Sequence, residues 1–429
     1  MELLFQRVQF LLFNSLSSFC YLYKNNLFET WVQMKLHFHI IKKIAEALDL
    51  IIDQNKYADK VIEKLFKANR KLGSRDRKFI AETIYEIVRH FRFYQEVAGT
   101  KESYNLIAVH LLKNEMDIQE LEDEFPLDIK SLKMNLKKKY PIEVIESFPD
   151  WLHQLGQEQF AQEWPQIMSA LNKPADVYLR TNTLKTDRET LIKELEKEEI
   201  ISEKVFNLPD AIRLIERKNV FSTQAFKNGF FEVQDAASQF IAPLLEVSPG
   251  MRVVDACAGA GGKSLHIAAL MKNKGKIISM DIHEWKLGEL KKRAARNRVD
   301  IIETKLIDTT KVIKRLEGSF DRVLLDVPCS GLGVIRRNPD TKWKLSQHEI
   351  DSLVRLQQDI ISDYSKLCKP KGMMIYATCS ILHKENEDQV RWFLSTPDGQ
   401  NWNLKKELRL WPHKDLYDCF YAAVLEKKS

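Results

Sequence analysis

The stretch that decides the fold reads Val253-Val-Asp-Ala-Cys-Ala-Gly-Ala-Gly-Gly-Lys263. It begins as a short apolar run and ends in a glycine-rich turn, and a helical pattern follows as far as Met271. Glycines let the backbone turn sharply and approach a ligand closely. The lysine stands at the wrong spacing for a phosphate-binding P-loop. The stretch therefore predicts a strand, a turn and a helix, and the turn either binds a ligand or is only a tight connection.

Strands and helices alternate from Gln234 to the end of the chain. The predicted strands cover residues 252–256, 276–281, 320–326 and 373–378, and a helix is predicted over residues 284–298. Such alternation is typical of an α/β fold, a mostly parallel sheet with helices on both faces. Ligands of these sheets bind at the carboxyl ends of the strands.

The sequence before this region has a different pattern of apolar residues. Residues 34–165 repeat apolar positions at helix spacing, and residues 170–233 read as a small α+β module with strands at 176–182 and 211–215. Residues 1–33 are expected to be an extension without a role in the fold, because their longest apolar run, 8–13, is too short to cross a membrane. The predicted domains are thus 1–33, 34–165, 170–233 and 234–429.

Composition narrows the class of protein. The 429 residues are 44% hydrophobic and 29% charged, with a net charge of +6, which fits a globular protein and permits a nucleic-acid partner without requiring one. The six cysteines include no CxxC pair, so neither a disulfide framework nor a metal site is expected. A reducing, cytoplasmic setting follows. Basic side chains in the helical region form either a solvated face or an RNA-binding face: Arg70, Lys71, Arg75, Arg77, Lys78, Arg89 and Arg92.

Carboxylates stand at successive strand ends. Asp281 closes its strand 22 residues after Gly259, close to the roughly 20 residues seen in dinucleotide-binding sheets. At that position a carboxylate accepts hydrogen bonds from ribose hydroxyls. Asp308 ends the next short strand and is a candidate for the adenine side. Each aspartate alone could cap a helix, but with Asp255 they mark three strand ends in a row.

Two cysteines end strands on the same rim. Cys329 follows Asp326 in a Pro-Cys-Ser turn, and Cys379 stands in a Thr-Cys-Ser turn. A lone cysteine is usually a small packing residue. Two cysteines at ligand-rim positions, one of them near a carboxylate, favour reactivity. The remaining cysteines are interpreted as packing residues: Cys20, Cys257, Cys368 and Cys419.

These segments resemble the RsmB/NOP family of RNA (cytosine-5) methyltransferases, most closely its bacterial 16S ribosomal RNA members. Three motifs carry the resemblance: Cys257-Ala-Gly-Ala-Gly-Gly-Lys263, Asp326-Val-Pro-Cys-Ser-Gly-Leu-Gly-Val-Ile-Arg-Arg-Asn-Pro-Asp-Thr-Lys-Trp343 and Tyr376-Ala-Thr-Cys-Ser-Ile-Leu-His-Lys-Glu-Asn-Glu387. Val233–Ser238 and Phe420–Leu425 resemble the first and last segments of the family's catalytic domain. Ala260 is a departure, since the family usually has proline there. Ser74–Phe79 resembles the NusB-like domain of bacterial members.

The resemblance implies a Rossmann-like methyltransferase domain with a seven-stranded, mostly parallel sheet. It implies S-adenosylmethionine as cofactor, bound by Cys257, Ala258, Gly259, Ala260, Gly261, Gly262, Lys263, Asp281, Asp308 and Asp326. It assigns Cys379 as the nucleophile that adds to carbon 6 of the cytosine, and Cys329 as the residue that assists release of the product. Asp326 would bind the cytosine edge. The implied partner is RNA, with a monomeric enzyme, no membrane and no metal.

Several alternatives stay open from sequence. Transfer RNA is the second choice of substrate after 16S ribosomal RNA. A non-catalytic RNA-binding or ribosome-assembly factor on the same scaffold is a different class, although both cysteines are present. A methyltransferase for another atom is less favoured, because no Asn-Pro-Pro-Tyr-type motif occurs. Finally, the roles of Cys329 and Cys379 could be exchanged, because DNA cytosine methyltransferases attack from a Pro-Cys motif.

Overall fold

The computed structural model describes residues 37–307 and 311–429. The proposed extension, 1–33, and Asp308 lie outside the described residues. The chain divides into two compact units, Met1–His153 with Asn338–Asp340, and Gln154–Arg337 with Thr341–Ser429. Among the described helices, none combines the length and the apolar character needed to cross a bilayer.

The first unit is helical, as predicted. In α2 the apolar residues Ile41, Ile44 and Leu48 recur at helix spacing, and all three are buried. Helix α5 ends at Gly99, whose left-handed backbone (φ 70°) suits glycine. The helices are α2 (Phe38–Ile52), α3 (Ala58–Ala68), α4 (Ser74–Arg89), α5 (Phe91–Ala98), α6 (Ser103–Lys113), α7 (Gln119–Glu124), α8 (Ile129–Leu136) and α9 (Ile142–Ile145).

The second unit begins within helix α10 (Asp150–Phe160) and continues through α11 (Trp164–Asn172) into a small α+β module. The module's antiparallel sheet has the strand order β2-β3-β1-β4. Helix α12 (Arg188–Glu196) starts at Asp187, whose side chain accepts a hydrogen bond from the Thr190 N–H, and it buries Leu191 and Leu195 against the sheet. The strands are β1 (Tyr178–Thr181), β2 (Ser202–Lys204), β3 (Ala211–Leu214) and β4 (Phe231–Val233), and α13 (Gln224–Lys227) precedes β4.

The rest of the second unit is built on a seven-stranded sheet with the order β10-β11-β9-β8-β5-β6-β7. Strands β9, β8, β5, β6 and β7 pair in parallel, and β10 and β11 are antiparallel. This confirms the predicted α/β fold with a mostly parallel seven-stranded sheet. The strands are β5 (Arg252–Asp255), β6 (Lys276–Asp281), β7 (Ile302–Leu306), β8 (Phe320–Asp326), β9 (Cys368–Thr378), β10 (Trp402–Leu410) and β11 (Phe420–Lys427).

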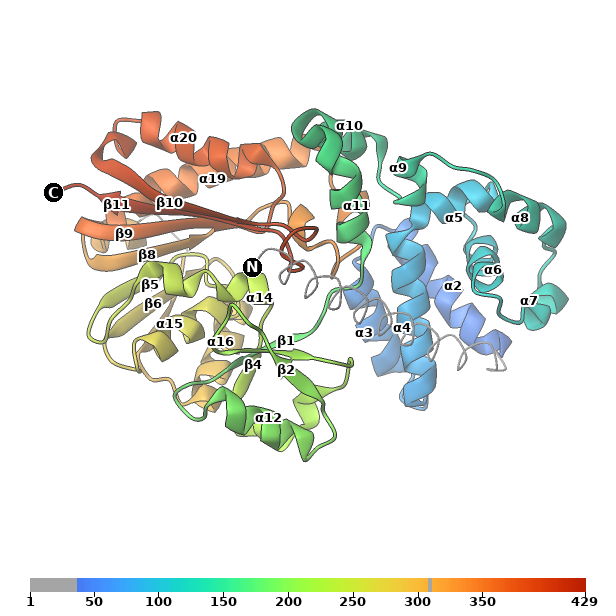
Figure 1. Ribbon diagram of the computed structural model, residues 1–429, viewed down its shortest axis with the longest axis horizontal. Helices are drawn as coiled ribbons and strands as arrows, with labels where there is room; N and C mark the ends of the chain where they lie inside the picture. The colour runs from blue at the N-terminus through green and yellow to red at the C-terminus, as the bar shows by residue number, and fades with distance from the viewer. Residues whose placement is uncertain (1–36, 308–310) are drawn as a thin grey trace, which may run out of the picture. The chain divides into compact units, whose positions relative to one another are not determined.

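Helices cover both faces of this sheet (Figure 1). On one face α14 (Ala236–Gln239), α15 (Gly262–Leu270) and α16 (Glu284–Asn297) enclose a core with β5 and β6. On the other, α19 (Gln347–Tyr364) and α20 (Glu387–Ser395) pack on β8 and β9. Burying one large apolar side chain of such a core contributes roughly 1.5–3 kcal/mol. Two short helices, α17 (Lys311–Arg315) and α18 (Thr341–Lys344), complete this part.

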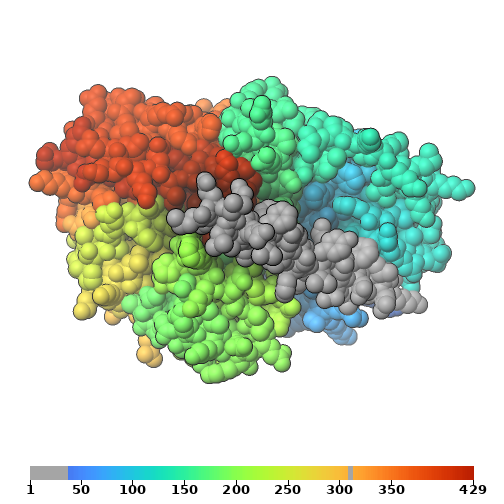
Figure 2. All heavy atoms as spheres, in the orientation of Figure 1, coloured from blue at the N-terminus to red at the C-terminus, as the bar shows by residue number. Residues whose placement is uncertain are grey.

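The small module lies directly against the sheet domain. Within this unit, the green residues of the module meet the yellow residues of α15 and α16 without a gap on the face shown in Figure 2. Asn182, at the end of β1, donates a hydrogen bond to the backbone carbonyl of Asn297 (3.2 Å). The module is therefore attached to the helices that follow the glycine-rich turn.

Candidate active site

The two cysteines of the predicted rim meet in space. Strands β8 and β9 are parallel neighbours, with Asp326 opposite Ala377 in the register. Cys329 follows the end of β8 by three residues, and Cys379 follows β9 directly. Their sulfur atoms lie 3.4 Å apart, and both residues are partly exposed. The sequence predicted a shared rim, and the structure makes the two sulfurs direct partners.

The two sulfurs differ in their environment. The pKa of Cys329 lies well above its ordinary value, because its thiol shares a hydrogen bond with Cys379 and because burial and nearby negative charge disfavour the thiolate. A thiol with a raised pKa keeps its proton. The hydrogen bond between the two sulfurs, together with burial, therefore favours a Cys329 that holds its proton beside Cys379.

The other described cysteines have surroundings that favour the thiol. Burial raises the pKa of Cys368 and of Cys419 to about 12 in each case, and it raises that of Cys257 as well. Cys368 and Cys419 are fully buried, as expected for packing residues. Cys419 packs behind the site, since its N–H donates to the Gly333 carbonyl (3.0 Å).

Asp326 is held by an ion pair at the end of β8. The Lys263 ammonium lies 2.5 Å from the Asp326 carboxylate and 4.9 Å from the centre of the Phe420 ring. Burial opposes the charge on Lys263, but attraction to Asp326 outweighs it and raises the lysine pKa. The Asp326 side chain keeps 28% of its surface exposed. It can therefore contact a ligand at the rim while its position stays fixed.

The glycine-rich turn needs its glycines for specific reasons. Gly259 and Gly261 have left-handed backbones (φ 55° and 82°), which favour glycine. A Cβ on Gly261 would lie 2.4 Å from the Leu290 side chain. Asp281 is 7% exposed, and its carboxylate accepts the Gly259 N–H (2.9 Å) and the His283 N–H (2.8 Å). The loop and the end of β6 are therefore joined by a direct hydrogen bond, which the sequence analysis did not predict.

Asp255, at the end of β5, has an unusual environment. It is 1% exposed, and Oδ2 accepts the Ser264 hydroxyl (2.7 Å), whereas Oδ1 has no hydrogen-bond partner. Burial, with repulsion from Asp326, raises its pKa to about 7. A buried carboxylate oxygen without a partner fits a cationic ammonium group such as that of S-adenosylmethionine. The exposed Ile282 (65%), directly after Asp281, offers an apolar surface beside a carboxylate.

A charged network behind the loop was not foreseen from sequence. Arg180, on β1, donates to the Gly262 carbonyl (2.8 Å), and Arg293, on α16, donates to the Ala260 carbonyl (2.8 Å). Glu232, on β4, accepts from Arg293 (2.8 and 3.0 Å). Both loop carbonyls are thus held by guanidinium groups. The signal in the sequence was a charged residue inside a short apolar strand, at Arg180 and again at Glu232.

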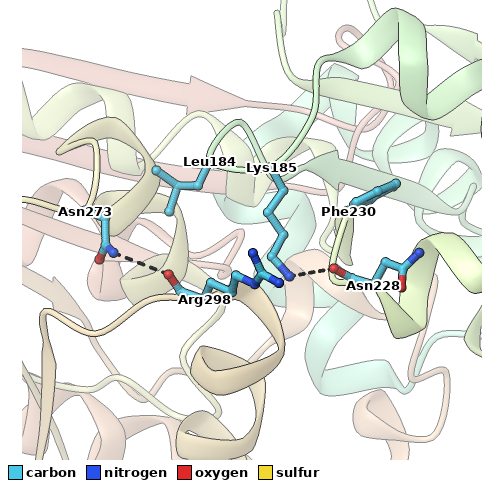
Figure 3. A pocket seen from close by; sticks show the side chains of 6 residues that line it. All are labelled: Leu184, Lys185, Asn228, Phe230, Asn273 and Arg298. Carbon is cyan, nitrogen blue, oxygen red and sulfur yellow. Dashed lines mark hydrogen bonds between the residues drawn. The ribbon is translucent and has the colours of Figure 1, made fainter.

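A separate pocket lies between the small module and the ends of α15 and α16 (Figure 3). It has a volume of about 470 Å³, and Lys185 and Arg298 point into it. The Lys185 ammonium donates to the carbonyls of Asn228 (2.6 Å) and Arg296 (2.7 Å). Lysine there satisfies carbonyls at two helix ends. The six described residues that line the pocket include no thiol or carboxylate, so we assign it no part in the chemistry.

Comparison with known proteins agrees with this geometry. Residues 242–426 match the family model described as 16S rRNA methyltransferase RsmB/F, and residues 148–221 match a ferredoxin-like domain of RsmF/B-like methyltransferases.

Two similar proteins are each called probable ribosomal RNA small subunit methyltransferase B. The one from Synechocystis is 32% identical over 314 residues, with 69% of each chain covered, and the one from Bacillus subtilis is 35% identical over 300 residues, with 66% and 67% covered. The crystal structure of PH0851 is 26% identical, with a TM-score of 0.76, over 92% of this chain and 100% of that one. The chain therefore belongs to the RsmB/F family of 16S ribosomal RNA methyltransferases.

Proposed function

We propose that the chain methylates carbon 5 of a cytosine in 16S ribosomal RNA, with Cys379 as the covalent nucleophile. Its family makes it an S-adenosylmethionine-dependent methyltransferase of ribosomal RNA. The observation that carries the cytosine chemistry is the pair of sulfurs, 3.4 Å apart at the ends of adjacent parallel strands. A methyltransferase that acts on a nucleophilic amine has no need of two thiols.

The chemistry requires a thiolate because carbon 5 of cytosine is a poor nucleophile. In this proposal the Cys379 sulfur bonds to carbon 6, the ring electrons move toward nitrogen 3, which is protonated, and carbon 5 gains enamine character. S-adenosylmethionine supplies the electrophilic methyl group on its sulfonium. Nitrogen 3 then gives back its proton, a base takes the proton from carbon 5, the double bond between carbons 5 and 6 re-forms and the bond between Cys379 and carbon 6 breaks.

Cys329 and Asp326 support these steps. Cys329 keeps its proton beside Cys379, so its thiol can donate a hydrogen bond to the Cys379 sulfur as that sulfur leaves carbon 6. The Asp326 carboxylate, held by Lys263, would accept hydrogen bonds from the exocyclic amine of the cytosine and from nitrogen 3 once that nitrogen is protonated. The base must leave its stack to reach this rim.

The loop residues 257–263 and Asp281 are proposed to bind S-adenosylmethionine. The loop carries Gly259 and Gly261 in conformations that bring the backbone close to a ligand, and it leads into the N-terminus of α15. Asp281 keeps free acceptor sites after its two backbone hydrogen bonds, which suits ribose hydroxyls. Asp308, outside the described residues, remains the proposed contact on the adenine side.

The helical unit is proposed to add affinity for RNA and to take no part in catalysis. Of the seven basic residues singled out from the sequence, three have a structural role: Arg77 donates to the Leu72 carbonyl, Arg89 is buried, and Arg92 pairs with Asp150 (2.8 Å). The other four of the seven are exposed: Arg70, Lys71, Arg75 and Lys78. Exposed cations of this kind bind phosphates in a salt-dependent way.

A denaturing gel of cysteine variants tests the central proposal. Cys379→Ala should neither transfer methyl groups nor form a covalent complex with RNA. Cys329→Ala should attack but release slowly, so a protein–RNA species that survives denaturation should accumulate. Cys368→Ala, a fully buried cysteine at the start of β9, is the matched control and should behave as the wild type. An adduct with Cys379→Ala and none with Cys329→Ala would reverse the assignment.

The substrate is tested in cells. Bisulfite sequencing of total RNA with and without the gene should show the loss of 5-methylcytosine at a site in 16S ribosomal RNA. Loss confined to transfer RNA would support the alternative substrate. Unchanged methylation in every RNA would support a non-catalytic role.

A further inference from the structure

A fully buried carboxylate joins the two cysteine-containing turns. Glu385 lies in the short turn His383–Glu385 after β9, and it is 0% exposed. One carboxylate oxygen accepts the N–H of Ser330 (2.8 Å), and the other accepts the hydroxyls of Ser330 (2.6 Å) and Ser380. Ser330 directly follows Cys329, and Ser380 directly follows Cys379. Glu385 therefore binds the neighbour of each reactive sulfur.

The hydrogen bonds of this cluster account for every donor. Gln357, on α19, gives Glu385 a fourth donor (3.0 Å), and a carboxylate has about four acceptor sites. Each serine hydroxyl uses its one proton on Glu385 and accepts a backbone N–H, from Leu332 (3.4 Å) and Leu382 (3.0 Å) respectively. The two serine oxygens lie 3.1 Å apart. Two hydroxyls can approach so closely because one carboxylate accepts from both.

Glu385 is itself fixed from several directions. The Tyr376 hydroxyl donates to the Glu385 carbonyl (2.7 Å). Gln357 also donates to the carbonyl of Pro328 (2.9 Å), the residue before Cys329. The turn that carries Cys329 is thus held on both sides of the cysteine, by Gln357 before it and by Glu385 after it.

We propose that Glu385 is a positioning residue that sets the separation of the two sulfur atoms. It contacts neither sulfur and acts through Ser330 and Ser380. The inference rests on the proposed roles of Cys379 and Cys329, because only a reaction that uses both sulfurs needs their separation fixed. The buried negative charge also helps to keep the proton on Cys329. If Glu385 had only a structural role, its replacement would lower the stability of the fold and leave the separation of the two sulfur atoms unchanged.

The first test needs no RNA and no cofactor. The full-length protein is equilibrated with oxidised and reduced glutathione, and mass spectrometry measures the peptide that links Cys329 to Cys379. Two thiols and one oxidised glutathione give one disulfide and two reduced glutathiones, so the equilibrium constant reports how closely the thiols are held. In Glu385→Gln an amide N–H₂ group replaces one carboxylate oxygen. This group cannot accept hydrogen bonds, so the donors that bind that oxygen lose their acceptor. We expect the constant to fall about tenfold or more, since a displacement of about 1 Å can cost 100-fold in a positioned reaction.

The controls separate positioning from folding. Glu426→Gln, on the neighbouring strand β11, should leave the disulfide constant unchanged. Glu385→Asp, which keeps the charge, should restore part of the loss. Calorimetric binding of S-adenosylmethionine should stay unchanged in Glu385→Gln, because the loop and Asp281 lie on other strands. If Glu385→Gln does not fold, the double variant Ser330→Ala with Ser380→Ala replaces it, and its disulfide constant should fall in the same way. A wild-type disulfide constant in the folded variant would overturn the proposal.

The second test links the positioning to the reaction. In the Cys329→Ala background, where the adduct accumulates, adding Glu385→Gln should slow adduct formation about tenfold or more at saturating RNA. An unchanged rate would overturn the positioning role. Adduct formation by Cys379→Ala would instead overturn the proposed function, and the glutathione measurement would still decide the role of Glu385. The two failures are therefore distinguishable.

Discussion

Replacing Asp255 by asparagine should make the free protein more stable above pH 7 and should weaken its binding of S-adenosylmethionine. Asp255 is 1% exposed, its Oδ1 has no partner, and its pKa is raised to about 7 by burial and by repulsion from Asp326. A charged Asp255 is thus unfavourable in the free protein. The same charge is what a bound ammonium group requires.

The magnitude follows from the difference between the two pKa values. The folded protein holds a proton on Asp255 up to about pH 7, whereas the ordinary pKa is 3.8. The stabilisation from this proton is fully present below about pH 4 and is lost as the pH rises to 7. About three pKa units correspond to about 4 kcal/mol. Asparagine avoids this loss but costs roughly 1–3 kcal/mol if its amide finds no acceptor. At pH 8 the variant should therefore gain about 1–3 kcal/mol.

Urea unfolding at two pH values gives the test. Between pH 5 and pH 8 the stability of Asp255→Asn relative to wild type should rise by about 3 kcal/mol. This is the share of the roughly 4 kcal/mol that the wild type loses above pH 5. Asp300→Asn, at an exposed position, should show no such change. Calorimetry at pH 8 should show weaker cofactor binding by Asp255→Asn. A relative stability that does not depend on pH would refute the reasoning.

Three further predictions concern binding. Asp281→Ala should weaken S-adenosylmethionine binding about 10- to 100-fold in calorimetry, because hydrogen bonds to a charged group contribute about 1.5–3 kcal/mol; unchanged affinity would contradict the proposed placement. Arg293 binds the Glu232 carboxylate through two nitrogens and the Ala260 carbonyl through a third, and the single ammonium of Arg293→Lys cannot replace all three. Cofactor affinity should therefore fall about fivefold with the fold retained. Arg75→Ala with Lys78→Ala should reduce the slope of log affinity for RNA against log salt by about 1–2, and equal slopes would argue against an RNA-binding face.

The sequence predicted those strands whose apolar pattern is continuous. The bounds predicted for 276–281 and 320–326 match β6 and β8. Strand β9 begins at Cys368, five residues before the predicted start, because Phe320 on β8 pairs with Cys368. The prediction started later because the residues from Lys369 to Gly372 have the sequence of a turn. Strand β10 is an edge strand with mostly exposed polar residues, so it shows no apolar pattern.

The candidate site was predictable only in part. Strand ends in a parallel sheet share one edge, and this rule brought Cys329 and Cys379 to one rim. It could not show that the sulfurs touch, because the contact depends on which strands are neighbours and on the turn after each. The bonds of Glu385 to Ser330 and of Arg180 to Gly262 join residues 55 and 82 positions apart. Side-chain directions over such separations follow from packing, which no local pattern encodes.

The assignment of roles to the two cysteines depends on environment and not on strand position. Both residues end parallel strands, and either sulfur could reach the same base. Only one negative charge is favourable on two sulfurs 3.4 Å apart, since a second would meet strong repulsion. The hydrogen bond to Cys379, burial and the negative charge of Glu385 all raise the pKa of Cys329, so Cys329 is the sulfur that holds a proton. In the proposed mechanism the Cys379 sulfur attacks carbon 6, and the Cys329 thiol donates a hydrogen bond to that sulfur as it leaves.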